Sequence, residues 1–197
     1  MAVELGAWAL GLIFWPHSPR VCTREAAEEI GQSLKREAEV VGVFVNATLD
    51  EVAVLADRCS LTMLQLHGDE GPVYCREVAR RTGCKVMKAV SVKDASSVET
   101  LRAFPTDFHL VDAHVPGQRG GTGQSFNWDL ARRHRGPVPL VLSGGLTADN
   151  VGEAITAVHP WGVDSASGTE ASPGVKDPER LAAFFRAVEA ADPVPAA

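Results

Sequence analysis

The sequence predicts an α/β fold of the TIM (β/α)8-barrel type, and three observations support this. Short apolar runs alternate with helical patterns at about 25 residues per unit, which is typical of a barrel or of a doubly wound sheet. The runs are mostly apolar throughout, as expected for parallel strands that are buried on both faces. Polar residues follow the carboxyl ends of these runs, and in a barrel those ends converge on one mouth. In an open sheet they would spread along an edge, with the chemistry at one switch point.

Seven runs are predicted strands, and helical patterns lie between them. The strands are expected at residues 9–14, 40–45, 62–66, 85–90, 108–112, 138–142 and 162–165. Helical patterns include residues 25–36, 49–58, 73–81 and 148–158. Thr48 with Glu51 forms a capping box, and Asp177 followed by Pro178 caps the last helix.

The amino-terminal residues 3–7 have the pattern of a last helical turn that closes at Gly6. A barrel of this period needs one more strand and most of a helix ahead of Met1. We therefore expect the first strand and most of the first helix to be absent from this chain, with seven strands visible. Residues 1–189 are predicted to form a single domain, and residues 190–197 a disordered tail.

Composition excludes several classes of partner and compartment. The formal net charge of -6, from 19 basic and 25 acidic side chains, argues against nucleic acid as the main partner. No apolar run approaches the roughly 20 residues that a membrane span requires. The four cysteines lack CxxC spacing, so neither a disulfide framework nor a zinc site is expected, and a cytoplasmic location fits better.

Two features around the fifth predicted strand are candidates for chemistry. Asp112 ends that strand, where a carboxyl group can donate or accept a proton; a helix-capping or ion-paired aspartate is the alternative. The run 120–123, which contains Gly121, lies eight to eleven residues beyond Asp112. Glycine permits close approach of the backbone to a ligand, and a surface loop without a ligand is the alternative.

Two small-residue turns follow the last two predicted strands. The first contains Gly144 and Gly145, and the second contains Ser167 and Gly168. Backbone N–H groups in such turns bind phosphate well, and barrels often place a phosphate after their last two strands. Tight turns without a ligand are the alternative interpretation of each.

Three further polar residues lie at or near the ends of predicted strands. The planar guanidinium of Arg20 suits a carboxylate or a phosphate, although a solvated surface arginine is the alternative. His67 could transfer a proton or donate a hydrogen bond, or it could be structural. Lys88 is also expected at a strand tip. A single histidine does not make a metal site.

Taken together, these segments resemble one family, the phosphoribosylanthranilate isomerases. The resemblance extends from about Gly6 to Phe185, with the pieces in the same order and at similar spacing. Each piece is short, and their joint occurrence is what makes the resemblance specific. The matching segments are residues 11–20, 41–44, 64–68, 110–112, 120–128, 142–146 and 162–177.

The resemblance implies a barrel enzyme of tryptophan biosynthesis that needs no metal and no cofactor. The family carries out the Amadori rearrangement of N-(5-phosphoribosyl)anthranilate to 1-(2-carboxyphenylamino)-1-deoxyribulose 5-phosphate. By resemblance, Asp112 is the general acid that protonates the ring oxygen, and Arg20 holds the anthranilate carboxylate. The turns at Gly144-Gly145 and Ser167-Gly168 hold the phosphate. His67 and Gly121 complete the expected substrate contacts.

One departure from the family is expected to matter for activity. The family's general base is a cysteine at the end of its first strand, and that segment is absent from this chain, so impaired turnover is expected. Cys22 is the nearby thiol that could substitute, although we do not favour this role, and Cys59, Cys75 and Cys84 are expected to be packing residues. A noncatalytic relic that binds a phosphosugar and a different phosphate-binding barrel enzyme are the alternatives. The chain is expected to be a monomer or a homodimer.

Overall fold

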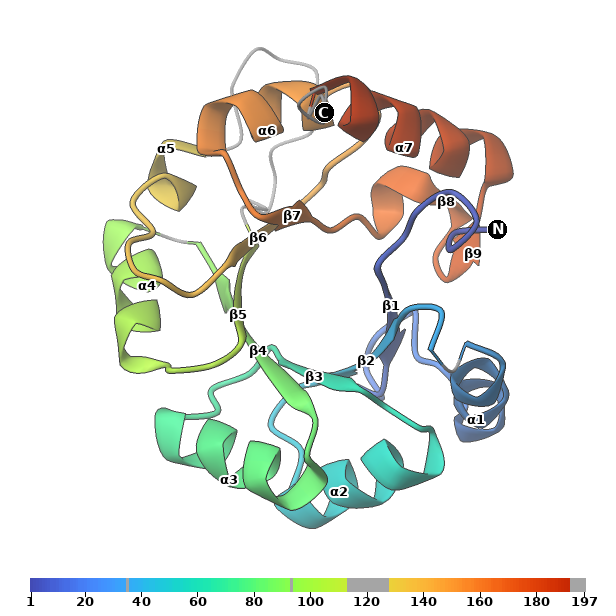
Figure 1. Ribbon diagram of the computed structural model, residues 1–197, viewed down its shortest axis with the longest axis vertical. Helices are drawn as coiled ribbons and strands as arrows, with labels where there is room; N and C mark the ends of the chain where they lie inside the picture. The colour runs from blue at the N-terminus through green and yellow to red at the C-terminus, as the bar shows by residue number, and fades with distance from the viewer. Residues whose placement is uncertain (35, 93, 113–127, 192–197) are drawn as a thin grey trace. The chain divides into compact units, whose positions relative to one another are not determined.

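A computed structural model describes residues 1–34, 36–92, 94–112 and 128–191 of the chain (Figure 1). Within these residues, seven strands form one sheet whose order follows the chain from β1 to β7. Two further strands, β8 and β9, pair with each other. In chain order the elements are β1 (Ala9–Ile13), α1 (Arg24–Ser33), β2 (Glu39–Phe44), α2 (Leu49–Arg58), β3 (Met63–Leu66), α3 (Pro72–Thr82), β4 (Lys85–Ser91), α4 (Ala95–Glu99), η1 (Thr100–Ala103), β5 (Phe108–Asp112), α5 (Trp128–Ala131), β6 (Leu140–Ser143), α6 (Val151–Val158), β7 (Gly162–Val163), η2 (Ser167–Thr169), β8 (Glu170–Ser172), β9 (Val175–Lys176) and α7 (Pro178–Ala191).

The chain divides into two compact units, each of which is described by itself. The first unit comprises Met1–Ala89 with Ala103–His109, and the second comprises Val90–Arg102 with Leu110–Ala197. The single domain expected over residues 1–189 stays a prediction. Of the expected tail, residues 190 and 191 belong to α7, and residues 192–197 lie outside the described part of the chain.

The sheet of the first unit is parallel from β1 to β4. Ile13 is paired with Val43, and Leu66 is paired with both Phe44 and Lys88, so the carboxyl ends of the strands lie along one edge. The apolar face of these strands packs against α2 and α3 in one buried cluster, which includes Val40, Val52, Leu64, Val78 and Val86. This edge is therefore the place where the loops that follow the strands gather.

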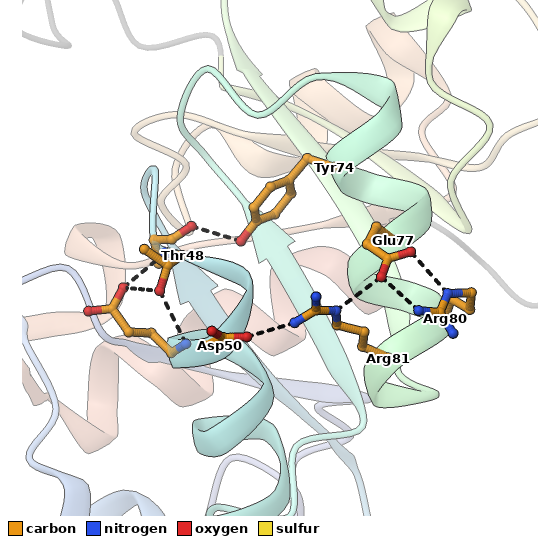
Figure 2. A network of polar contacts seen from close by, with 8 residues as sticks. Thr48, Asp50, Tyr74, Glu77, Arg80 and Arg81 are labelled. Carbon is orange, nitrogen blue, oxygen red and sulfur yellow. Dashed lines mark hydrogen bonds and ion pairs between the residues drawn. The ribbon is translucent and has the colours of Figure 1, made fainter.

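The helices α2 and α3 pack side by side and are joined at their surface by polar contacts (Figure 2). The predicted capping box is confirmed, because Thr48 Oγ1 accepts from the Glu51 N–H and Glu51 Oε2 accepts from the Thr48 N–H. Arg81 of α3 donates to Asp50 of α2 at 2.7 Å and to Glu77 at 3.0 Å. The contact of Arg81 with Asp50 links the two helices at their surface, while their buried faces pack together against the first unit's sheet.

In the second unit, β6 and β7 are parallel neighbours, with Val141 opposite Gly162. The helices α6 and α7 lie side by side (Figure 1). A buried cluster that includes Leu142, Leu146, Val151 and Phe184 joins these strands to the helices. The predicted cap of the last helix is confirmed, since Asp177 Oδ1 accepts from the N–H groups of Glu179 and Arg180.

All seven predicted strands are present in the predicted order, with boundaries that differ by at most two residues, and the described residues add the pair β8 and β9, which was not predicted. The predicted helical turn at residues 3–7 is also confirmed. Gly6 has a φ of 100°, its N–H bonds to the Val3 carbonyl, and the Ala7 N–H bonds to the Ala2 carbonyl, which is the pattern that ends a helix. Lys88 was expected at a strand tip, but it lies within β4, which extends to Ser91. Its side chain is buried against an acid instead.

Within the described part of the chain, no helix combines the length and the apolar character needed to cross a membrane.

Candidate functional site

Arg20 lies in the loop that leaves the carboxyl end of β1. The loop folds back on that strand, because the Cys22 N–H donates to the Ile13 carbonyl at 2.8 Å and Val21 forms a parallel bridge with Ile13. The Arg20 N–H donates to Ser18 Oγ at 3.1 Å, which fixes the turn just before the arginine. The backbone therefore holds Arg20 near the edge where the first unit's strands end.

His67 follows β3 directly, at the same edge of the first unit. Its backbone N–H continues the strand pairing by donating to the Phe44 carbonyl at 2.9 Å. Its ring Nδ1 lies 3.4 Å from Gln65 Nε2, so the orientation of the ring is coupled to a residue of the strand. The residue as a whole is only partly buried.

A buried ion pair holds the loop that carries His67. Lys88 Nζ lies 2.9 Å from Glu70 Oε2, and the two side chains are 4% and 2% exposed. Lys88 Nζ also donates to the carbonyl groups of Leu66 and Gly68, at 3.2 and 2.6 Å. Glu70 accepts from the N–H groups of Asn46 and Gly68, at 2.7 and 2.9 Å. The pair thus joins the residues at the carboxyl ends of β2 and β3 to the middle of β4.

Gly68 is the point at which the loops after β2 and β3 touch. A side chain at this position would place its Cβ 2.4 Å from Asn46 Oδ1, so only glycine fits. Asn46 itself has a φ of 53°, and its Oδ1 accepts from the Asp69 N–H at 2.7 Å. Asparagine tolerates this left-handed conformation better than most residues. Glycine at position 68 and asparagine at position 46 are therefore the residue types that this contact between the two loops requires.

Asp112 is the last residue of β5, in the second unit. The sheet order makes β5 a neighbour of β6, whose last residue is Ser143. The Asp112 carbonyl accepts from the Val92 N–H at 2.9 Å, which fixes the backbone at the end of the strand. The residue is partly buried, and the role of its carboxyl group as a proton donor stays a prediction.

The structure brings together the two turns that the sequence suggested for phosphate. Ser165 Oγ donates to the Leu146 carbonyl at 2.7 Å, and a Cβ on Gly168 would lie 1.9 Å from that same carbonyl oxygen. The turn after β7 therefore packs directly on the turn after β6. Gly144 and Gly145 have φ values of 107° and 67°, which glycine adopts without steric cost.

Two residues that were given no role support these turns. Asn150 accepts from the Thr147 N–H at 2.9 Å and donates to the Gly145 carbonyl at 3.2 Å, so it braces the first turn from the start of α6. Asp164, at the end of β7, accepts from Ser143 Oγ at 2.8 Å. Asp164 directly follows its strand, whereas Asp112 is the last residue of its strand, and an acid near the end of an apolar run was the sequence signal available for both.

The candidate site residues are thus distributed over the two units. Arg20 and His67 belong to the first, and Asp112 with the two turns belongs to the second. Gly121 lies outside the residues that the structure describes. Within the described ranges, no cluster of three or more His, Cys, Asp or Glu residues could hold a metal ion. Burial raises the pKa of the Cys22 thiol, which disfavours the thiolate that a substitute base would need.

Comparisons with known proteins agree with the resemblance seen in the sequence. The family described as N-(5'phosphoribosyl)anthranilate (PRA) isomerase matches residues 1–187. An N-(5'-phosphoribosyl)anthranilate isomerase of Geotalea uraniireducens (strain Rf4) is 48% identical over 186 residues, which cover 94% of this chain and 90% of the relative.

Solved structures extend this similarity to the fold. A phosphoribosyl anthranilate isomerase from Thermotoga maritima is 38% identical with a TM-score of 0.83, and the match covers 96% of this chain and 91% of that one. Another isomerase structure, in complex with reduced 1-(o-carboxyphenylamino)-1-deoxyribulose 5-phosphate, is 36% identical with a TM-score of 0.81 over 96% and 91% of the chains. The predicted fold class, an α/β fold of the (β/α)8-barrel type, is confirmed by these matches.

Proposed function

We infer the activity of this chain from one premise, which is that it belongs to the N-(5′-phosphoribosyl)anthranilate isomerase family. The family's activity is an aldose–ketose isomerisation in tryptophan biosynthesis. The substrate is N-(5-phosphoribosyl)anthranilate, and the product is 1-(2-carboxyphenylamino)-1-deoxyribulose 5-phosphate. In this Amadori rearrangement the ribose ring opens and an aldose amine becomes an aminoketose.

One observation in this chain carries the proposal, namely the contact between the two turns of the second unit. The product analogue bound to the related isomerase carries a phosphate group. We assign the phosphate of this chain's substrate to the turns at Gly144-Gly145 and Ser167-Gly168, which pack together at the Leu146 carbonyl. N–H groups at such turns and helix starts favour anions. The acidic net charge makes a local cradle of this kind necessary for an anionic substrate.

The remaining roles follow the chemistry of the reaction. Asp112 is proposed to protonate the ring oxygen, which allows the furanose to open. Arg20 is proposed to hold the anthranilate carboxylate, because its planar guanidinium can donate two parallel hydrogen bonds. His67 and Gly121 are proposed as further substrate contacts. The base that removes the sugar C2 proton is not assigned to a residue of this chain.

The proposed partner is this one small molecule, bound by a chain that acts as a monomer or a homodimer without nucleic acid. The four free cysteines favour a reducing compartment, which agrees with a proposed location in the cytoplasm.

The decisive experiment is a fluorescence assay for the consumption of phosphoribosylanthranilate. Replacing Asp112 by Asn is expected to lower kcat by about 10²–10⁴-fold, the usual contribution of one acid–base group. The matched control is Asp57→Asn, an exposed aspartate on α2, which is expected to leave kcat unchanged. Binding of the substrate without turnover by the unaltered chain would instead support the noncatalytic alternative. Equal turnover by Asp112→Asn and by the unaltered chain would contradict the assignment of the acid.

A further inference from the structure

Lys176 is returned to the turn after β7 by a short hairpin. The strands β8 and β9 are antiparallel, with Glu170 opposite Lys176 and Ser172 opposite Val175. The two residues between the strands are Pro173 and Gly174, and Gly174 has a φ of 81°. Proline followed by a glycine of positive φ is the signature of a type II turn. The hairpin thus brings residue 176 back to residues that precede it by up to eleven positions.

The ammonium group of Lys176 makes three hydrogen bonds to this turn. Its Nζ donates to Thr169 Oγ1 at 2.8 Å, to the Ala166 carbonyl at 3.1 Å and to the Ser165 carbonyl at 3.4 Å. Thr169 is 1% exposed, and its own hydroxyl donates to the Ala166 carbonyl at 3.1 Å. The carbonyl of Ala166 is therefore held from two sides by residues that come after it in the chain.

The direction of these carbonyl groups fixes the direction of the N–H groups that follow them. A peptide unit is planar and trans, so its C=O and N–H bonds point in opposite directions. Because the Ala166 carbonyl points at Lys176, the N–H of Ser167 points away from Lys176. The Ser165 carbonyl sets the N–H of Ala166 in the same way. The close approach of Gly168 to the Leu146 carbonyl holds the other end of the turn.

We propose that Lys176 is a positioning residue for the phosphate: it aims the backbone N–H groups of Ala166 and Ser167 at the phosphate and places a positive charge behind them. This inference rests on the proposed function, which assigns the phosphate to this turn. Hydrogen bonds to a charged donor are about twice as strong as neutral ones, so one lysine can hold a turn that has little side-chain packing. Lys176 acts through the backbone, and it is not placed in contact with the reacting atoms.

The test is Lys176→Met, which keeps an unbranched side chain and removes the charge and the three hydrogen bonds. We expect KM for the substrate and the Kd for inorganic phosphate to rise by about 10-fold, with kcat changed by less than about threefold, because a contact to the distant phosphate contributes mainly uniform binding. Lys176→Arg keeps the charge but presents its donors in a planar fork, so it should restore phosphate affinity only in part. Phosphate binding is measured by calorimetry, and folding by circular dichroism and urea titration.

The matched control is Lys85→Met, since Lys85 is another exposed lysine that loses an ion pair, with Glu39 of the first unit. It should leave the Kd for phosphate unchanged.

An unchanged phosphate Kd in folded Lys176→Met would overturn the inference, and so would an unaltered chain that does not bind inorganic phosphate. If Lys176→Met does not fold, Lys176→Arg decides: a phosphate Kd equal to that of the unaltered chain overturns the inference, and a partial loss supports it. Phosphate binding that depends on Lys176, in an unaltered chain without turnover, would refute the proposed function and support this inference.

Discussion

Two ion pairs of the first unit have similar lengths but lie in opposite surroundings. Lys88 Nζ lies 2.9 Å from Glu70, and both side chains are almost fully buried. Arg81 Nη1 lies 2.7 Å from Asp50, whose side chain is 89% exposed (Figure 2). Water solvates and screens the second pair, so it is expected to contribute little to stability. Burial removes the first pair from water, and each charge then depends on the other.

The two pairs also differ in what they connect. Arg81 joins helices whose buried faces already pack together, so its loss leaves other contacts in place. Glu70 and Lys88 bind backbone groups at the ends of two neighbouring strands, β2 and β3, and β3 leads into His67. The length of an ion pair therefore does not set its importance for stability. Burial, and the backbone groups that would be left without a partner, decide it.

The largest effect is therefore expected from Lys88→Met, which leaves the Glu70 carboxylate buried without its cation. We expect the free energy of unfolding to fall by about 3–5 kcal/mol, measured by urea titration. Combining Lys88→Met with Glu70→Gln removes both charges and should be less damaging than Lys88→Met alone. A loss below about 1 kcal/mol for the single variant would show that the pair has no special role, since exposed pairs already reach that value.

This buried pair also marks the limit of what the sequence could predict. The strands were predictable because each is a short apolar run between turn residues, and β5 was predicted with both of its ends correct. The sequence also placed Lys88 near the carboxyl end of an apolar run. That its side chain is buried against Glu70, 18 residues earlier, depends on packing between neighbouring strands, and no local pattern encodes such a contact.

The candidate site was predictable to a similar degree. The two glycine turns were recognised from composition, and glycine was correctly expected where the backbone comes close to another group. Their mutual contact at the Leu146 carbonyl could not be predicted, because it joins residues about twenty positions apart. The β8–β9 hairpin was missed because its strands are two and three residues long and largely polar. Without it, Lys176 had no visible reason to be near residue 166.

An intermediate loss in the free energy of unfolding is expected from Tyr74→Phe, because the tyrosine is less buried than Lys88 and more buried than the surface ion pairs. The Tyr74 hydroxyl donates to the Ala47 carbonyl at 2.8 Å and is partly buried at the contact between α3 and the start of α2 (Figure 2). Losing one such hydrogen bond costs about 0.5–1.5 kcal/mol of the free energy of unfolding. Urea titration measures this loss, and a loss equal to that of Lys88→Met would contradict the ranking by burial.

Tyr74 also makes the stability of the folded state depend on pH, and its burial fixes the sign of this dependence. Burial raises the pKa of Tyr74 to about 12, with the Glu70 carboxylate adding to the shift. A raised pKa means that the neutral phenol is stabilised in the folded state. This stability is fully present below the ordinary value of 10.0 and is lost as the pH rises through about 12.

This chain has a single tyrosine, so its phenolate absorbance reports Tyr74 alone. At about pH 11 the folded chain should remain mostly protonated, while the chain unfolded in urea should be mostly ionised. Equal ionisation of the two states at this pH would show that the hydroxyl is not buried as the structure has it.

The smallest effect is expected from Glu77→Gln, in the surface network of Figure 2. Hydrogen bonds from Arg80, which has the larger effect, and from Arg81 lower the pKa of the Glu77 carboxyl to about 2. The contribution of such a group is present above its ordinary pKa of 4.5 and is lost as the pH falls through about 2. Because the carboxylate is on the surface, solvent screens this contribution, and at neutral pH the urea midpoint should move less than in Tyr74→Phe.

Repeating the urea titrations at high salt distinguishes the exposed ion pairs from the buried one. At about 1 M salt the screening length falls to about 3 Å, so the remaining effect of Glu77→Gln should disappear. The effect of Lys88→Met should persist, because dissolved salt ions cannot approach a pair whose two side chains are both buried. If the loss in Lys88→Met were also removed by salt, the pair would have to be open to solvent. The ends of β2 and β3 would then be held by strand pairing alone, and the loop with His67 would need another support.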